Sequence, residues 1–424
     1  MPTGIIFNLP GASGHINPTV GLVEALCGAG HRVVYYAGED SRRTIEQRGA
    51  EFRTYAPYFD YHHNAAAAGS VVDMAMVQLE LAERCLEGLR SDLQALSPDY
   101  ILYDSCCMWG KMLARALGLP AVCLITTVVS TPLLMLADAR FTGGIVGEMA
   151  IKLPTRLLRA RRQLRAMLAS MDLPYHNIVH HAFDVFANEG DLNLVFLAPS
   201  FQPFSSRLDA SRFVFCGASV PAGRDADSLG PIKQPGRPLV YISLGTVHNL
   251  RDAFYRQCFE AFADQPLDVI MSVGAGTRLE ELGEPPANVR VFPRVPQLEV
   301  LGQADAFVSH GGMNSINESM YFGVPMVMVP QQIEQRFNAR RIERAGAGLH
   351  LSPAAVSAQR LRSAVQRLLH ESTFRQAAQT LQRELHATGG YQRAAREIMA
   401  RVDATPAGSA SPPGAAEGQH RQQQ

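Results

Sequence analysis

The sequence predicts an α/β protein made of two Rossmann-like domains that face each other across a cleft. Short apolar strands alternate with amphipathic helices along most of the chain, which is typical of parallel sheets covered by helices. A stretch rich in Pro, Gly and charge, residues 199–237, separates two such series. Each series also places a glycine-containing turn directly after a buried strand, where parallel sheets carry their ligand sites.

Length and charge restrict the function classes. With 424 residues the chain is long enough for two domains that each bury a core. Its 39 basic and 39 acidic residues cancel, so no net field recruits nucleic acid or an anionic membrane. This balance favours a small-molecule partner, and we expect a monomer or a weak homodimer.

The cysteines and the apolar runs indicate a cytoplasmic protein. The seven cysteines are odd in number and scattered, mostly within apolar runs, which favours reduced, buried thiols over a disulfide framework. The N-terminus has neither the charged region nor the apolar region of a signal peptide. The longest apolar run, residues 117–136, is interrupted by Pro120 and Pro132, so we expect no membrane span.

The first half begins with a βαβ unit: a strand at residues 4–9, a turn at 10–14, a helix from Asn17 and a strand at 31–37. Apolar runs and helical periodicity predict its remaining elements. These are a helix at 72–96, strands at 100–104 and 121–126, a helical stretch over 144–188 interrupted by Pro154 and Pro174, and a strand at 192–197.

The same patterns predict a second βα series after residue 237. Its strands are expected at 238–243, 267–272, 289–292, 306–309 and 326–329, and its helices at 253–263, from Met313, at 334–345, within 357–388 and at 391–402. We therefore divide the chain into an N-terminal domain (1–198), a linker (199–237), a C-terminal domain (238–388), a last helix that packs back on the N-terminal domain (389–403) and a disordered tail (404–424).

The strongest local pattern lies in residues 307–335. A strand ends at a turn formed by His310, Gly311 and Gly312, and a helix begins near Met313. A helix that begins there directs unpaired backbone N–H groups and a positive dipole end at its ligand, which makes an anion site. Side chains extend this site: His310, Asn314 and Ser315 can donate to phosphate oxygens, and Glu318, one helical turn further on, can accept from a hydroxyl. Phosphate together with a polyol indicates a nucleotide sugar.

The first turn of the N-terminal domain contains one titratable group, His15. The positive end of the following helix is expected to lower its pKa, so that the imidazole can accept a proton near neutral pH. Asp104 ends another strand of the same sheet, where its carboxylate can bond the second ring nitrogen. Such a pair fixes the tautomer and stabilises the imidazolium as it forms.

Two patterns that could suggest a metal are weak, so we predict none. His176, His180 and His181 have helical spacing, but the glutamate expected between zinc-binding histidines and a third ligand are both missing. The only Asp-x-Asp pattern, Asp225 to Asp227, lies in the linker and not at a strand end.

Two other function classes were considered. A nicotinamide or flavin oxidoreductase would need G-x-G-x-x-G at the first turn, whereas this chain has GASGHINPTVG, with His15 where close pyrophosphate approach needs a small residue. The second class is a non-catalytic nucleotide-sugar binding protein. The presence of both His15 and Asp104 argues against it.

Three segments together resemble a known family: GHINP at the first turn, RVPQLEVL at residues 294–301, and SHGGMNSINES with PQQIEQ in residues 309–335. The chain is similar over residues 4–402 to the inverting glycosyltransferases of family 1, the UDP-glycosyltransferase superfamily, which have the GT-B fold. The likeness is greatest to their bacterial macrolide and flavonoid glucosyltransferase branch. The three segments agree with the family in order and spacing.

The resemblance implies catalytic and donor-binding roles. His15 would be the general base and Asp104 its partner. The donor-binding positions would be Thr246, Arg294, Val295, Gln297, His310, Gly312, Asn314, Ser315, Glu318, Glu334 and Gln335. Val295 and Gln297 would hold the base and Glu318 the ribose, while Glu334 and Gln335 would hold sugar hydroxyls.

His310, Gly312, Asn314 and Ser315 would surround the diphosphate, with Thr246 on its other side. Arg294 stands where plant members carry a tryptophan, so the choice between uracil and thymine stays open, and Glu334 stands where many relatives have aspartate.

The resemblance thus implies an inverting hexosyltransferase that moves glucose from UDP-glucose to a hydroxyl of a hydrophobic acceptor, without a metal or another cofactor. Apolar segments with scattered Met and Phe, residues 55–76 and 130–149, favour a polyketide, macrolide or flavonoid acceptor, in antibiotic biosynthesis or resistance. A donor of the dTDP-deoxysugar type is the alternative.

Overall fold

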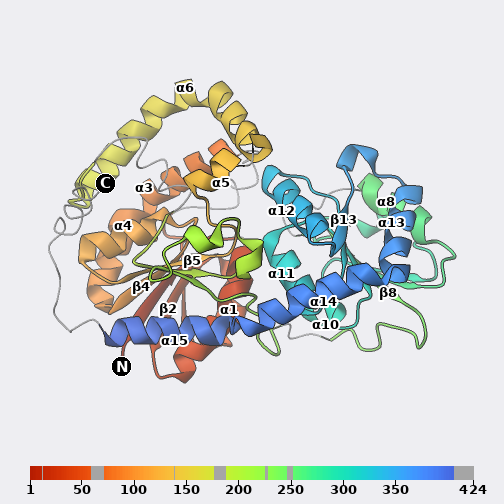
Figure 1. Ribbon diagram of the computed structural model, residues 1–424. Helices are drawn as coiled ribbons and strands as arrows, with labels where there is room; N and C mark the ends of the chain where they lie inside the picture. The colour runs from red at the N-terminus through yellow and green to blue at the C-terminus, as the bar shows by residue number, and fades with distance from the viewer. Residues whose placement is uncertain are drawn as a thin grey trace.

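The structure, a computed structural model, describes residues 1–11, 13–58, 71–137, 139–175, 188–224, 228–245 and 252–404. Two parallel sheets, each surrounded by helices, form two domains that lie side by side (Figure 1). The predicted fold class of two Rossmann-like α/β domains is confirmed.

The N-terminal sheet has seven strands in the order β3-β2-β1-β4-β5-β6-β7, and each strand runs parallel to its neighbours. The strands are β1 (Thr3–Phe7), β2 (Arg32–Ala37), β3 (Glu51–Thr54), β4 (Tyr100–Asp104), β5 (Ala121–Ile125), β6 (Leu192–Val195) and β7 (Phe213–Phe215). Since β7 pairs with β6, this sheet extends into the segment that the sequence assigns to the linker.

The helices of this domain are α1 (Ser13–Gly28), α2 (Arg42–Glu46), α3 (Val71–Leu96), α4 (Met108–Leu117), α5 (Pro132–Ala137) and α6 (Ala139–Ser170), with short 3-10 turns η1 (Glu39–Ser41), η2 (Pro199–Phe201) and η3 (Ser205–Arg207). Helix α1 begins at Ser13, four residues before the predicted start, so His15 lies in its first turn. The expected interruption at Pro154 is absent, because α6 runs through it. A proline inside a helix removes one backbone hydrogen bond, and a long helix keeps the others.

Alternation along β1 divides the N-terminal core into two layers. Ile5 and Phe7 belong to the cluster that holds Trp109 of α4, whereas Ile6 points the other way, into the cluster that holds Val23 of α1. All of these side chains are buried. Successive side chains of a strand point to opposite faces, so a strand that is apolar throughout needs helices on both sides.

The C-terminal sheet has six strands in the order β10-β9-β8-β11-β12-β13. They are β8 (Leu239–Ser243), β9 (Asp268–Ser272), β10 (Val289–Phe292), β11 (Ala306–Ser309), β12 (Met326–Met328) and β13 (Gly348–His350), and the last was not predicted. The helices are α8 (Asp252–Phe262), α9 (Leu279–Leu282), α10 (Gln297–Leu301), α11 (Met313–Tyr321), α12 (Ile333–Arg344), α13 (Ala358–His370) and α14 (Ser372–Ala387), with a 3-10 turn η4 (Pro353–Ala355).

The strand orders place the candidate residues at equivalent points of the two sheets. In the N-terminal sheet the chain order reverses between β1 and β4, and in the C-terminal sheet between β8 and β11. Ligands of open α/β sheets bind outside the carboxyl ends of the strands at these reversals. The three candidate residues lie at these ends: His15 in the first turn of the helix after β1, Asp104 as the last residue of β4, and His310 directly after β11.

The last helix, α15 (Gly390–Asp403), crosses from the C-terminal domain and packs against α1 (Figure 1). Ala394, Ala395 and Ile398 belong to the buried cluster of the N-terminal domain. Helix α1 accommodates Tyr391 at Gly21, where a Cβ would lie 2.7 Å from the tyrosine ring.

Polar contacts between the domains fix their arrangement. The side-chain amide of Asn317 on α11 donates to the carbonyl of Phe196 at 2.8 Å, in a buried position. Arg341 of α12 donates to the carbonyl of Ser200 at 2.7 Å, and Glu384 of α14 accepts from the backbone N–H of Ser200 at 3.0 Å. Among the described helices, none is long and apolar enough to cross a membrane.

Replacing Ile398 with alanine tests the docking of α15. The side chain is fully buried, so the truncation is expected to lower the free energy of unfolding by about 2 to 5 kcal/mol, through lost burial and the cavity left behind. Urea denaturation followed by circular dichroism measures the change. The exposed Gln392→Ala on the same helix is the control and should shift stability by less than about 0.5 kcal/mol. Equal effects of the two variants would show that α15 is not packed as described.

Candidate active site

The predicted pair of His15 and Asp104 is in contact. His15 lies in the first turn of α1, directly after β1, and Asp104 is the last residue of the adjacent strand β4. Nδ1 of His15 lies 2.9 Å from Oδ2 of Asp104. The carboxylate is fully buried, whereas the imidazole keeps 24% of its surface exposed. Because Asp104 accepts the Nδ1 proton, Nε2 is left as the atom that can accept a proton from a ligand.

Two further groups hold this pair in place. The second carboxylate oxygen of Asp104 accepts from the backbone N–H of Cys106 at 2.8 Å. The hydroxyl of Thr126, after β5, lies 3.3 Å from Nδ1 of His15. A carboxylate bonded through both oxygens cannot rotate away from the imidazole, so the ring orientation is set by the backbone after β4.

A buried network that sequence reasoning missed fixes the start of α1. The side-chain amide of Asn8 donates to the carbonyl of His15 at 3.1 Å and to the hydroxyl of Tyr35 at 2.8 Å. The Tyr35 hydroxyl lies 2.7 Å from that of Thr19, one turn further along α1. In the sequence, Asn8 is the one polar residue of the strand predicted at 4–9, which is the signal that could have singled it out.

The pKa of His15 is raised above its ordinary value of 6.5. Burial lowers it, but the charge and hydrogen bond of Asp104, together with the charge of Glu334, outweigh that effect. The expectation of a lowered pKa is therefore wrong, because the carboxylates of Asp104 and Glu334 favour the protonated imidazole. A histidine with a raised pKa is a stronger base and needs a higher pH to be neutral.

Glu334, in the C-terminal domain, interacts electrostatically with the pair. It lies in the first turn of α12, where Asn338 donates to its carboxylate at 3.1 Å. Burial raises the pKa of Glu334 above its ordinary value of 4.5, and the hydrogen bond from Asn338 and the charge of His15 lower it in part. Each residue thus shifts the pKa of the other, so the carboxylate predicted to hold the sugar lies within electrostatic range of the predicted base.

The glycine turn after β11 is shaped by the ring of His310. Gly311 has a φ of +83°, which L residues with a side chain rarely adopt. A Cβ at Gly245, after β8, would lie 2.7 Å from the ring, and one at Gly312 would overlap it. Both positions therefore need glycine, and the ring stands between the turns after β8 and β11, ahead of the N–H groups of α11.

The donor residues on α11 lie where the sequence places them, but they contact one another. Glu318 is 1% exposed and accepts from the side-chain amide of Asn314 at 2.7 Å and from that of Gln297, on α10, at 2.5 Å. It also accepts from the guanidinium of Arg224, which sequence reasoning did not select. The residues predicted for base, ribose and diphosphate are thus joined in one network. Ser315, also predicted for the diphosphate, is buried on the same helix.

The other predicted donor residues have varied surroundings. Gln335 is buried, and its side-chain oxygen accepts from the backbone N–H groups of Gln331 at 2.8 Å and Gln332 at 3.1 Å, so it shapes the loop before α12. Arg294 is exposed and Val295 is half-buried, both just before α10. The predicted contact at Thr246 lies outside the described residues, as do the histidine and Asp-x-Asp patterns considered for a metal.

The pair and a neighbouring cysteine together have atoms that could bind a metal ion. The ligand atoms of His15, Asp104 and Cys106 all lie within 4.8 Å of one another. Burial, and after it the charge of Asp104, raises the pKa of the Cys106 thiol well above its ordinary value, which disfavours the thiolate that metals bind. Since Nδ1 of His15 already faces Asp104, the arrangement suits proton transfer better than metal ligation.

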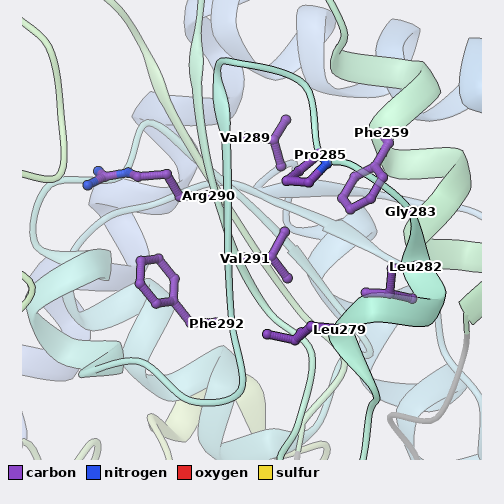
Figure 2. Close-up of a pocket in the computed structure, with 9 residues that line it drawn as sticks. All are labelled: Phe259, Leu279, Leu282, Gly283, Pro285, Val289, Arg290, Val291 and Phe292. Atoms are coloured by element: carbon purple, nitrogen blue, oxygen red, sulfur yellow. The ribbon is translucent and has the colours of Figure 1, made fainter.

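A separate hollow of about 400 Å³ lies on the C-terminal domain, at the edge strand β10 (Figure 2). Its lining is mostly apolar and includes Phe259, Leu279, Leu282, Val289 and Val291. None of the predicted site residues lines it. We therefore place the candidate active site at the His15 pair and the turn after β11, and not at this hollow.

Two Rossmann-like domains with a His–Asp pair at one sheet reversal and a glycine turn at the other agree with the glycosyltransferase class that the sequence resembles, and the comparisons with known proteins show the same class. Residues 256–400 match the family described as Erythromycin biosynthesis protein CIII-like, C-terminal domain. The chain is 36% identical over 403 residues to NDP-glycosyltransferase YjiC of Bacillus licheniformis, covering 93% of this chain and 96% of that protein.

Two more comparisons agree. Oleandomycin glycosyltransferase of Streptomyces antibioticus is 30% identical over 400 residues, with 93% and 89% of the two chains covered. The crystal structure of the glycotransferase of kitacinnamycin superposes with a TM-score of 0.82 at 29% identity, covering 95% of this chain and all of that one. The chain therefore belongs to the glycosyltransferases of family 1, the UDP-glycosyltransferase superfamily, and it is an enzyme with the GT-B fold.

The pH dependence of Asp104→Asn tests the electrostatics of the pair. A general base works above its pKa, so wild-type kcat/KM should fall on the acid side at a pH above 6.5, the ordinary value for histidine. Losing the Asp104 charge lowers the pKa of His15, which moves this acid limb to lower pH. The rate should also fall by about 10²- to 10⁴-fold, because the tautomer is no longer held.

The control is Asp99→Asn, at the opposite end of the same strand region, where the carboxylate accepts from the backbone N–H of Thr3. Its pH profile should match that of the wild type. If kcat/KM of Asp104→Asn falls at the same acid pH as in the wild type, this fall does not report the protonation of His15.

Proposed function

We propose that this enzyme transfers glucose from UDP-glucose to a hydroxyl group of a hydrophobic small molecule, with inversion at the anomeric carbon. The proposal is supported by the hydrogen bond between His15 and Asp104 and by the electrostatic coupling of His15 with Glu334 of the other domain. We assign these residues as the base, its partner and a sugar-binding carboxylate. A base within reach of a sugar-binding group suits transfer of the sugar to an acceptor hydroxyl.

His15 is proposed to remove the acceptor proton. As the acceptor oxygen bonds to the anomeric carbon, its proton moves to Nε2 of His15, and the bond from that carbon to the diphosphate breaks. The attack comes from the face opposite the leaving group, as in other inverting displacements at sugars. Asp104 stabilises the imidazolium that forms, and the proton is then released to solvent.

The leaving diphosphate is proposed to be held by the N-terminus of α11. Backbone N–H groups and the positive dipole end favour the charge that develops on the leaving oxygens. His310, between the turns after β8 and β11, and Ser315 are proposed to add side-chain donors. Because these groups supply the charge stabilisation, we propose that transfer needs neither a metal ion nor another cofactor.

The remaining donor contacts follow the family resemblance. We propose that Val295 and Gln297 hold the base with Arg294 beside it, that Glu318 accepts from the ribose, and that Glu334 and Gln335 hold sugar hydroxyls. In support, Gln297 and Glu318 lie in contact. A dTDP-sugar is the alternative donor, since the relative from Bacillus licheniformis carries the general name NDP-glycosyltransferase.

The acceptor is proposed to be a polyketide, macrolide or flavonoid. The segments expected to bind it, residues 55–76 and 130–149, lie in large part outside the described side chains. Leu133, at the start of α5, is a large apolar side chain with 41% of its surface exposed. A relative is named for oleandomycin, a natural product, which supports this class. We further propose a cytoplasmic location.

His15→Ala tests the base. Transfer should fall by about 10²- to 10⁴-fold, because no other group accepts the proton, while UDP binding by calorimetry should stay as in the wild type. The control is His31→Ala, a histidine at the start of β2 that contacts the hydroxyl of Tyr100 at 2.8 Å, away from the turn after β1. Transfer at the wild-type rate in His15→Ala would remove the base assignment.

Glu334→Ala tests the sugar contact. Losing hydrogen bonds to a charged acceptor should raise KM for UDP-glucose by about 10-fold or more. UDP alone carries no sugar, so its dissociation constant should not change. Glu343→Ala, near the other end of α12, is the control because that carboxylate accepts from the exposed backbone N–H of His350, away from His15. If donor KM is the same in all three proteins, Glu334 does not touch the sugar.

A further inference from the structure

Glu318, the carboxylate predicted to bind the ribose, forms an ion pair with Arg224, which lies in the segment between the two domains. Arg224 follows β7 in the segment that joins the two domains, and its guanidinium pairs with Oε1 of Glu318. The two side chains are 4% and 1% exposed. A buried arginine with its charge matched in this way is fixed in position and is costly to displace.

The N-terminal domain holds this arginine in place through its backbone. Arg48, after α2, donates to the carbonyl of Gly223 at 2.6 Å and pairs with Glu24 of α1 at 2.6 Å. Gly223 has a φ of +61°, so the chain turns sharply just before Arg224. The backbone of this segment is anchored on one domain and its side chain on the other.

The number of free acceptor positions on Glu318 then limits how many ribose hydroxyls this carboxylate can bind. A carboxylate offers about four lone-pair positions. Three of them are occupied by protein donors: Arg224 and Asn314 on Oε1, and Gln297 on Oε2. One position is left for a ligand hydroxyl. A ribonucleotide has hydroxyls on both the 2′ and the 3′ carbon. A thymidine nucleotide has only the 3′-hydroxyl.

We propose that Arg224 is a specificity-determining residue that limits Glu318 to one ribose hydroxyl, so that the enzyme accepts uridine and thymidine diphosphate sugars with similar affinity. This rests on the proposed function, in which Glu318 faces the ribose. Because only one acceptor remains, a 2′-hydroxyl gains no second bond to this carboxylate. Its absence in a deoxynucleotide therefore costs little.

The test is calorimetry on the full chain with three nucleotides: UDP, dUDP and dTDP. UDP and dUDP differ only in the 2′-hydroxyl, and dUDP and dTDP differ only in the methyl group of the base. For the wild type, the dissociation constants of UDP and dUDP should agree within about threefold. In Arg224→Met, which removes the donors and keeps a long side chain, an acceptor position is freed for the 2′-hydroxyl. UDP should then bind more tightly than dUDP by a factor of about 10 or more, because a hydrogen bond to a charged acceptor contributes that much.

Two controls separate this effect from a general disturbance. Arg224→Lys keeps a cation that can donate to Glu318, and it should retain the wild-type ratio. The ratio of dUDP to dTDP should be the same in every variant, because the base methyl lies away from Glu318 in the proposed binding mode. If Arg224→Met does not fold, Arg48→Met, which releases Gly223, should move the UDP to dUDP ratio in the same direction by a smaller factor.

The outcomes distinguish the two levels of the proposal. A wild-type preference for UDP over dUDP of about 30-fold or more, or an unchanged ratio in Arg224→Met, overturns the role of Arg224 and leaves the proposed function standing. Failure of the wild type to bind any of the three nucleotides overturns the proposed function itself.

Discussion

The hydrogen bond between His15 and the buried carboxylate of Asp104 depends on nearly every other feature of the N-terminal domain. It requires β1 and β4 to be parallel neighbours, so that the ends of the two strands meet at one edge of the sheet. It requires α1 to start within the turn after β1, which Asn8 secures by bonding the carbonyl of His15. Because the carboxylate is fully buried, removing its partner would leave a charge without compensation, so the pair also stabilises the edge on which it sits.

Three carboxylates near the site, the buried Asp104 and Glu318 and the half-buried Glu334, have different chemistry because their surroundings differ. Asp104 is committed to His15 and to the backbone after β4. Glu318 accepts from three side chains and has little capacity left. Glu334 accepts from one side chain, Asn338, and its raised pKa reflects incomplete compensation of its burial. The carboxylate with the fewest protein donors is therefore the one best suited to accept from a sugar with several hydroxyls.

The sequence predicted what local patterns determine. Apolar runs located the longer strands, and the residues at their ends, His15 and Asp104, could be assigned to one edge because parallel strands align there. Strand β7 is a short apolar piece surrounded by Pro, Gly and charge, so it was assigned to the linker. Strand β13, with the sequence Gly-Leu-His, has no apolar run and was missed. The sign of the His15 pKa shift was also wrong. The charge and hydrogen bond of Asp104, with a smaller contribution from the charge of Glu334, outweigh the effect of burial, and this balance depends on tertiary distances that the sequence does not contain.

Arg224 could not be predicted for a related reason: nothing in a segment rich in Pro, Gly and charge distinguishes an arginine that turns inward from one in solvent. Its position follows from tertiary contacts on both sides, through Arg48 on the N-terminal domain and Glu318 on the C-terminal domain. The same contacts mean that the predicted ribose site is linked to the domain that carries the base. A movement of one domain against the other would strain the Arg224 segment, so the occupancy of Glu318 and the placement of His15 opposite Glu334 depend on one interdomain arrangement.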